Sequence, residues 1–188
     1  MCCRYSVRRD GFKVIIQEAN EREDPSYSHV SINGDVCPGV AAPVMIESGY
    51  VGMKWGFSGQ NGMTINARAE TAAEKPMFRN SVRQWRCLVP ADGYYEWNEK
   101  KEKFYFTNSD GGMLFMAGLY RMGDDGKWQF VIVTRDSYGP AKPVHDRMPL
   151  LIRDRKQWFS YGTEALLTLG EEEELSSECQ SPQQLSFF

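Results

Sequence analysis

The fold is decided by residues 113–134, which read MLFMAGLYRMGDDGKWQFVIVT. Two runs rich in apolar, aromatic and β-branched residues, near 113–120 and 128–134, flank the polar segment GDDG at 123–126. Runs of this length on either side of a Gly/Asp turn are typical of a β-hairpin. We therefore predict two strands here, joined by a short connection.

Outward from this hairpin, short apolar runs and polar turns continue to alternate. We expect further strands near 43–47, 50–57, 63–67, 86–90, 93–98 and 103–107, with hairpin connections also at 58–62 and 109–112. Helices are expected at 10–21, with Asp10 as N-cap, and at 69–74, 78–83 and 154–161. The expected fold class is α+β: a mainly antiparallel sheet that curls into a barrel, with a few flanking helices.

The charge distribution divides the chain into a body and an acidic end. We expect one domain over 1–170 and an acidic flexible tail over 171–188, which holds five Glu and no Lys or Arg. The whole chain carries a net charge of −3, whereas the body without this tail has 22 basic and 20 acidic residues. A nucleic acid would therefore bind only through a local basic groove and not through the overall field.

Several classes of protein are not expected from this composition. The five cysteines (2, 3, 37, 87 and 179) are odd in number, show no CxxC spacing and accompany only two histidines, so neither a disulfide framework nor a metal site is predicted. No apolar run approaches the ~18 residues that span a membrane, and the start of the chain does not read as a signal peptide. We expect a cytoplasmic protein without cofactor.

Cys2 directly follows the initiator Met1, and its small side chain normally permits removal of that methionine. An N-terminal cysteine would then present a free α-amine and a thiol on adjacent carbons. The amine, which titrates near ~8, condenses with an aldehyde to an imine, and the thiol closes the imine into a thiazolidine. This pair indicates either aldehyde capture or amide cleavage by an N-terminal nucleophile.

Three further polar segments lie beside strand ends or turns, where functional sites usually lie. They contain Asn66, Glu96 and His145, and each residue also has an ordinary structural explanation. Asn66 could bond only to backbone, with Arg68 paired to Glu70; Glu96 could be an outward carboxylate of a strand, and His145 a satisfied loop histidine. The residues alone leave these alternatives open.

Four separated motifs occur in order between residue 1 and about residue 160. They are MCxRY at 1–5, NARAET at 66–71, PADGYYEW at 90–97 and HDRMP at 145–149. Together they resemble the SOS-response-associated peptidase family, the abasic-site-processing proteins. VCPG at 36–39 is similar to the family's Pro-containing loop, and MKWG at 53–56 to its Trp-Gly segment.

The resemblance implies a DNA-repair protein that senses abasic sites in single-stranded DNA and cross-links to them as a thiazolidine. It implies Cys2 as nucleophile, Asn66 as an orienting residue, and Glu96 and His145 as proton carriers. Possible further activities are autoproteolytic removal of Met1 and reversal of the cross-link. The DNA-binding residues that we expect are Arg4, Pro38, Trp55, Arg68 and Arg147, where Trp55 either stacks on a base or belongs to the core.

Other readings of the same residues remain. The family commonly has glycine after the nucleophile, whereas this chain has Cys3. An N-terminal-nucleophile cysteine peptidase that acts on peptides, or a non-catalytic module that binds single-stranded DNA, would also fit. We expect a monomer that associates with the nucleoid at damage sites.

The last five residues carry a separate signal. Gln184, Leu185, Phe187 and Phe188, with Ser186 between them, resemble the pentapeptide that binds the bacterial sliding clamp. An acidic flexible tether would let such a peptide reach an apolar groove on its partner. The alternative is that these apolar side chains fold back onto the domain.

Overall fold

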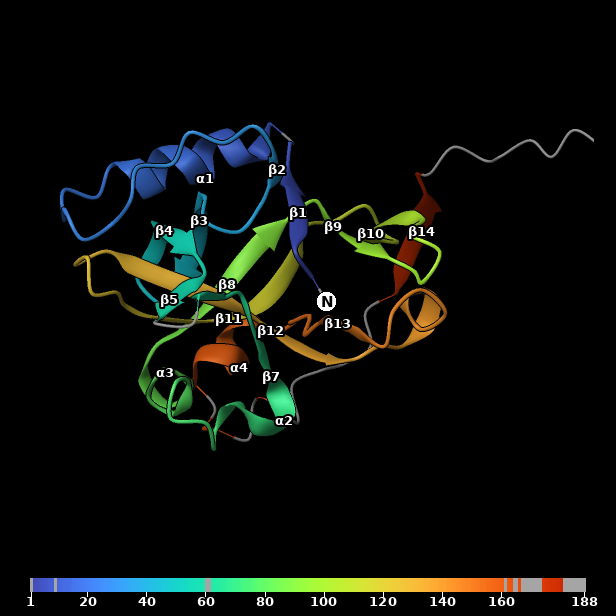
Figure 1. Cartoon of the computed structure of the whole chain (residues 1–188). Coiled ribbons are helices and arrows are strands. Elements are labelled where there is room, and N and C mark those ends of the chain that lie inside the picture. The colour runs from blue at the N-terminus through green and yellow to red at the C-terminus, as the bar shows by residue number, and fades with distance from the viewer. Residues whose placement is uncertain are drawn as a thin grey trace, which may run out of the picture.

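The computed structural model describes residues 2–8, 10–59, 62–160, 162–163, 166 and 174–180. Within this part of the chain the elements, in order, are β1 (Arg4–Val7), α1 (Gly11–Asn20), β2 (Gly34–Val36), β3 (Ala41–Ile46), β4 (Gly49–Trp55), β5 (Phe57–Gly59), β6 (Gly62–Thr64), β7 (Asn66–Arg68), α2 (Ala69–Ala72), α3 (Arg79–Gln84), β8 (Arg86–Ala91), β9 (Gly93–Trp97), β10 (Lys103–Asn108), β11 (Leu114–Met122), β12 (Trp128–Asp136), the 3-10 helix η1 (Gly139–Ala141), β13 (Arg147–Pro149), α4 (Arg155–Ser160) and β14 (Leu175–Cys179). Figure 1 shows their arrangement.

A barrel forms the larger part of the fold. Its strands follow the order β11–β8–β3–β4–β12, and β12 closes the circle by pairing with β11. The β11–β12 pair is antiparallel, with Tyr120 opposite Phe130, so the hairpin predicted from residues 113–134 is confirmed. β12 also pairs in parallel with β4 and β7, while the other barrel pairings are antiparallel. The expected fold class is therefore confirmed.

A second sheet brings the beginning of the chain against the barrel. Its order is β14-β10-β9-β1-β2, with neighbouring strands antiparallel. On its inner face, Tyr5, Tyr94 and Phe106 are fully buried and join the core that also includes barrel residues. Burial of these rings fixes β1 (Figure 1), and with it Cys2, which belongs to the same core cluster as residues of the barrel.

Helix α1 covers β3 and β4. Phe12, Ile15 and Ala19 are its buried residues, which matches the apolar face predicted from their spacing. Asp10 occupies the N-cap position, but its carboxylate pairs with Lys13 and makes no capping hydrogen bond. No helix among the described residues is long and apolar enough to cross a membrane.

The connection at 109–112 is not the hairpin that the sequence predicted. β10 pairs with β9 and β14, whereas β11 pairs with β8 and β12, so this turn leads from one sheet to the other. Asp110 shapes the turn by accepting a hydrogen bond from the Gly112 N–H at 2.6 Å. Turn chemistry therefore identified a change of direction here, but not the partner of the next strand.

The acidic tail predicted over 171–188 is wrong for residues 175–179. These residues form β14, which pairs with β10 from Phe104 opposite Cys179 to Asn108 opposite Leu175. Leu175 is buried against the core, and this contact together with the strand pairing explains the order. The pentapeptide at 184–188 lies outside the described residues.

Trp55 belongs to the core, which is the second of the two alternatives that the sequence left open for it. Its side chain is 0% exposed and packs between Tyr5 and Phe130, at ring-centroid distances of 5.2 and 6.2 Å. The indole Nε1–H donates to the Ile65 carbonyl oxygen at 3.0 Å. Because Ile65 precedes Asn66, this bond helps to position the segment that enters β7.

Trp55→Ala is expected to lower the free energy of unfolding by about 3–5 kcal/mol, because it leaves a large cavity in the core. Urea unfolding measures this loss. Trp97→Ala, at a half-buried position, serves as the comparison and should cost much less. Equal losses for the two variants would contradict the core assignment of Trp55.

Candidate active site at the N-terminus

Cys2 lies inside the protein at the open end of the second sheet. Side chains alternate along a strand, so continuing β1 by two residues would place Cys2 on the face of the half-buried Arg4. The Cys2 side chain is instead 0% exposed and belongs to the core. Its Sγ lies 3.9 Å from the Arg4 carbonyl oxygen, which is a weak contact. Burial raises the pKa of the Cys2 thiol well above its ordinary value, and the negative charge of Glu96 raises it further. The thiol is therefore neutral near pH 7.

Asn66 holds the main chain of Cys2. Its Nδ2 donates a hydrogen bond to the Cys2 carbonyl oxygen at 2.9 Å. β7 places this amide, because Asn66 pairs with Ile132 of β12. The other amide atom, Oδ1, is buried without a hydrogen-bond partner among the described residues. A buried acceptor of this kind is available to a ligand.

Glu96 lies on the inner face of β9 and is only 2% exposed. The pairing of Arg4 with Tyr95, continued by one residue, places Glu96 beside Cys3. Burial raises the pKa of Glu96 to about 7, and the charge of Asp146 contributes to the rise. A carboxyl group with this pKa can both donate and accept a proton at neutral pH.

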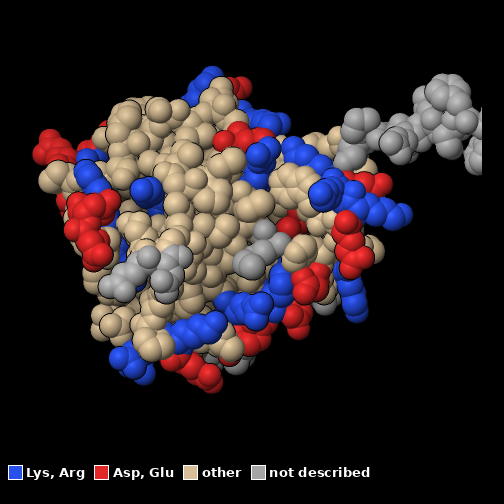
Figure 2. All heavy atoms as spheres, in the orientation of Figure 1, with Lys and Arg blue, Asp and Glu red and all other residues tan. Residues whose placement is uncertain are grey.

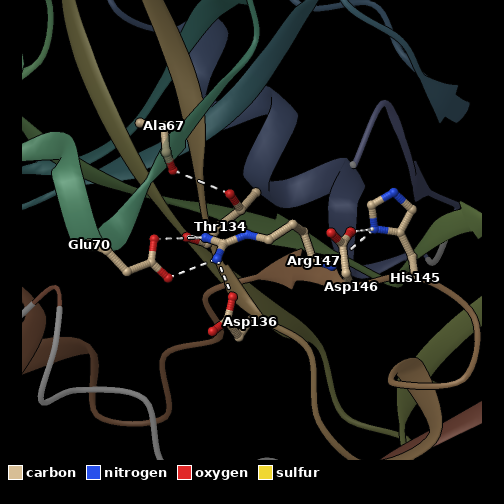
Figure 3. A network of polar contacts seen from close by, with 7 residues as sticks. All are labelled: Ala67, Glu70, Thr134, Asp136, His145, Asp146 and Arg147. Carbon is tan, nitrogen blue, oxygen red and sulfur yellow. Dashed lines mark hydrogen bonds and ion pairs between the residues drawn. The ribbon is translucent and has the colours of Figure 1, made fainter.

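His145 approaches from the segment between η1 and β13, with its side chain 27% exposed. Its Nδ1 accepts a hydrogen bond from the Arg147 N–H at 2.9 Å, and an Asp146 carboxylate oxygen lies 2.9 Å from the same atom (Figure 3). Burial lowers the pKa of His145, so the ring is neutral at pH 7.

The Arg147 guanidinium is already hydrogen-bonded within the protein, so it is not free to bind a phosphate as we expected. Its NH1 and NH2 donate to the two carboxylate oxygens of Glu70 at 2.8 and 3.0 Å (Figure 3). NH1 also donates to Asp136 at 2.5 Å, and NH2 to the Thr134 carbonyl oxygen at 2.7 Å. Glu70 therefore pairs with Arg147, and the tie joins the segment of Asn66 to that of His145.

The other predicted DNA-binding residues lie around this centre. Arg68 is exposed and lines a surface cavity together with Asn66, Lys75, Met77 and others. Arg4 is half-buried, 3.9 Å from Asp35, with its guanidinium 5.8 Å from the centre of the Trp97 ring. Pro38 is half-buried in the turn before β3.

A second cavity, of about 840 Å³, opens beside His145. Its lining includes Trp97, Lys100 and Lys142, which sequence reasoning did not select as site residues. The position of Trp97 directly after Glu96 was the signal that could have identified it. In Figure 2, Lys and Arg side chains gather on both sides of the place where Figure 1 marks the N-terminus.

Two buried hydroxyl groups near Cys2 were also missed. Tyr5 and Tyr94 are opposite one another on β1 and β9, and burial followed by the Cys2 charge raises the pKa of both. Each hydroxyl is buried without a hydrogen-bond partner among the described residues. With Asn66 Oδ1, these atoms make a set of unused polar groups beside the thiol.

The arrangement can perform proton transfer at a cysteine. Among the described residues, no group of three or more His, Cys, Asp or Glu side chains could hold a metal ion. Instead a neutral thiol, an anchoring amide, a carboxyl group with a pKa of about 7 and a neutral imidazole surround the beginning of the chain.

A family model described as SOS response associated peptidase (SRAP) matches residues 1–183. The chain belongs to this family. It is 30% identical over 177 residues to the abasic site processing protein YedK of Escherichia coli (strain K12), covering 85% of this chain and 79% of YedK. It is 35% identical over 106 residues to YobE of Bacillus subtilis (strain 168), covering 51% of this chain and 48% of that protein. The match to HMCES of Xenopus tropicalis is 29% identical over 128 residues and covers 53% of this chain and 38% of HMCES.

Solved structures share the fold. A crystal structure of a protein from Bacteroides thetaiotaomicron has a TM-score of 0.77 at 22% identity and covers 95% of this chain and 91% of its own. A crystal structure of a protein from Bordetella bronchiseptica has a TM-score of 0.74 at 18% identity, and the match covers 96% of this chain and 100% of that protein's chain. The SRAP fold is thus reproduced at low sequence identity.

Glu96→Gln is expected to stabilise the protein at high pH. The folded state holds the Glu96 proton more tightly than the unfolded chain, so stability is lost as pH rises from about 4.5 to 7. The glutamine variant avoids this loss and should gain up to about 3 kcal/mol above pH 7. Urea unfolding across this pH range measures it; the exposed Glu178→Gln is the control. An identical pH dependence in wild type and Glu96→Gln would contradict the raised pKa.

Glu70→Gln is expected to lower stability by about 1 kcal/mol at pH 7, a small effect because the pair reaches solvent. Hydrogen bonding to Arg147 lowers the pKa of Glu70, so the pair stabilises above the ordinary carboxyl pKa and fails as pH falls through the lowered value. The difference in free energy of unfolding between Glu70→Gln and wild type, measured by urea unfolding, should therefore disappear in acid. A difference that persists in acid would indicate a packing effect.

Proposed function

We propose that this protein captures abasic sites in single-stranded DNA as a covalent thiazolidine on Cys2, after removal of Met1. The observation that carries the proposal is the enclosure of Cys2 by Asn66 and Glu96, with His145 alongside. The names of the relatives, which are abasic site processing proteins, support the choice of substrate.

In the first step, the Cys2 α-amine attacks C1′ of the ring-opened sugar and forms a carbinolamine. Glu96 in its protonated form donates to the leaving hydroxyl, which departs as water and leaves a protonated imine opposite the Glu96 carboxylate. The Asn66 bond to the Cys2 carbonyl holds the nucleophile in place during this step. Asn66 Oδ1 is available to accept a hydrogen bond from the amine.

In the second step, Cys2 Sγ adds to the imine carbon and the ring closes. The thiol proton passes to the Glu96 carboxylate and restores its acid form, and addition of sulfur to the protonated imine leaves a neutral ring amine, so the capture releases one water overall. This relay suits a thiol whose raised pKa keeps it neutral until it reacts. In this proposal, Nε2 of His145 donates a hydrogen bond to a sugar oxygen. The reverse sequence would release the cross-link.

The strand would pass across Cys2 from one cavity to the other. Arg68 and Lys75 line the first, and Lys100 and Lys142 the second, so phosphates can be neutralised on both sides of the lesion. We expect binding that is salt-dependent and nearly independent of base sequence.

The test incubates the mature protein with an oligonucleotide that contains one abasic site and measures the band stable to heat and SDS. Cys2→Ala should abolish the band, and Cys2→Ser should give weaker or reversible adducts, because oxygen closes a far less stable ring. Glu96→Gln should slow capture by about 10²–10⁴-fold and remove an inflection near pH 7 from the pH–rate profile.

An oligonucleotide without the lesion and a mass-spectrometric check that Met1 is absent are the controls. No band from protein that lacks Met1 would refute aldehyde capture. Cys2-dependent cleavage of added peptides would then favour a peptidase, and non-covalent binding alone a passive module.

A further inference from the structure

The outer face of the five-stranded sheet carries a strip of aromatic and cationic side chains, bordered on β14 by the exposed carboxylate of Glu178, which lies opposite Tyr105. Register places Arg4 opposite Tyr95, Tyr95 opposite Tyr105, and Trp97 opposite Lys103. Because side chains alternate along a strand, these residues share the face that points away from Glu96. Tyr105, Trp97 and Lys103 are half-buried at this surface.

The Tyr105 ring packs against Tyr95 and Gly93. Its ring centroid lies 4.7 Å from that of Tyr95, and its hydroxyl is 2.7 Å from Ser6 Oγ. A Cβ added to Gly93 would come within 2.6 Å of the Tyr105 ring and within 2.4 Å of the Phe106 carbonyl oxygen. Glycine at position 93 therefore lets the ring approach the backbone closely.

Cations cover the other rings of the strip. Lys103 Nζ lies 3.9 Å from the centre of the Tyr95 ring, and the Arg4 guanidinium lies over Trp97. Asp35 holds the guanidinium of Arg8 beside the same strip. Alternating aromatic faces and cations are the two components with which proteins bind a nucleic-acid strand without reading its sequence.

The strip is continuous with the candidate active site. Arg4 is two residues from Cys2, and Trp97 directly follows Glu96. Trp97 also lines the cavity that contains His145. A strand bound at Cys2 can therefore continue over Trp97 onto the outer face without crossing another element of the sheet.

We propose that this outer face binds the single strand on one side of the abasic site, an inference that rests on the proposed function. Nucleobases stack on Trp97 and Tyr105, and Lys103 and Arg4 move from the rings to the phosphates. The occupant is a flexible single strand, because continuity with the reaction centre requires the same strand and the cations suit its phosphates.

The test measures fluorescence anisotropy with oligonucleotides that carry a tetrahydrofuran analogue, which has no aldehyde and cannot be captured. The strand is extended beyond the analogue on the 5′ side, on the 3′ side or on neither. Wild type should bind one extended strand at least about 5-fold more tightly than the short one, the gain expected from one stacked base. Tyr105→Ala should lose this gain, and Tyr105→Phe, which keeps the ring, should retain it.

Lys103→Gln tests the face without removing a packed ring, and it should lower the slope of log affinity against log salt by about 1 for the extended strand. Lys13→Gln is the matched control, because Lys13 is 80% exposed on α1 and is not part of the strip. The proposal is overturned if neither extension tightens binding, or if Tyr105→Ala and Lys103→Gln both keep the wild-type gain. Since no adduct forms in this assay, that result is distinct from a failure of Cys2 capture.

Discussion

Strand β12 closes the barrel through β11 and β4, and its far end then runs between β7 and β13. These last two pairings set the candidate site. Ile132 opposite Asn66 places the amide that holds Cys2, and Asp136 opposite Arg147 places the segment that begins with His145. Because one strand fixes both segments, a shift of its end would move the anchoring amide and the imidazole together. The Glu70–Arg147 tie opposes such a shift, since it joins the same two segments directly.

Burial of Glu96 near Cys2 lowers the stability of the fold and gives the carboxyl group a pKa suited to proton transfer. A carboxyl group that is 2% exposed and has a pKa of about 7 destabilises the fold whenever it ionises. The hydroxyls of Tyr5 and Tyr94 and the Asn66 Oδ1, which have no hydrogen-bond partner within the described part of the chain, add to this cost. Burial of the aromatic core, which includes the stacked rings of Trp55 and Phe130, offsets this loss of stability. Rigid packing thus supports the site in addition to the Asn66–Cys2 and Glu70–Arg147 contacts.

Strand positions were largely predictable, because alternation and turn residues are local signals. Which strands pair is a long-range property, and for this reason the turn at 109–112 was assigned to a hairpin although it links two sheets. The short strands β1, β2, β13 and β14 were missed, since three to five residues hold too little alternation. The motifs located Asn66, Glu96 and His145, but they could not show that Trp55 is enclosed by rings from other strands or that Arg147 already has carboxylate partners.

The difference between Arg147 and Arg68 follows from desolvation. The Arg147 side chain is 12% exposed, and its fork is filled by Glu70, so a phosphate would have to displace a bidentate carboxylate. Such an exchange replaces one anion by another and gains little. Arg68 is exposed at the edge of a cavity, so a phosphate can approach it while the guanidinium keeps part of its water. Counterion release then favours contact at Arg68 and the cavity lysines, while Arg147 maintains the geometry that such contacts would exploit.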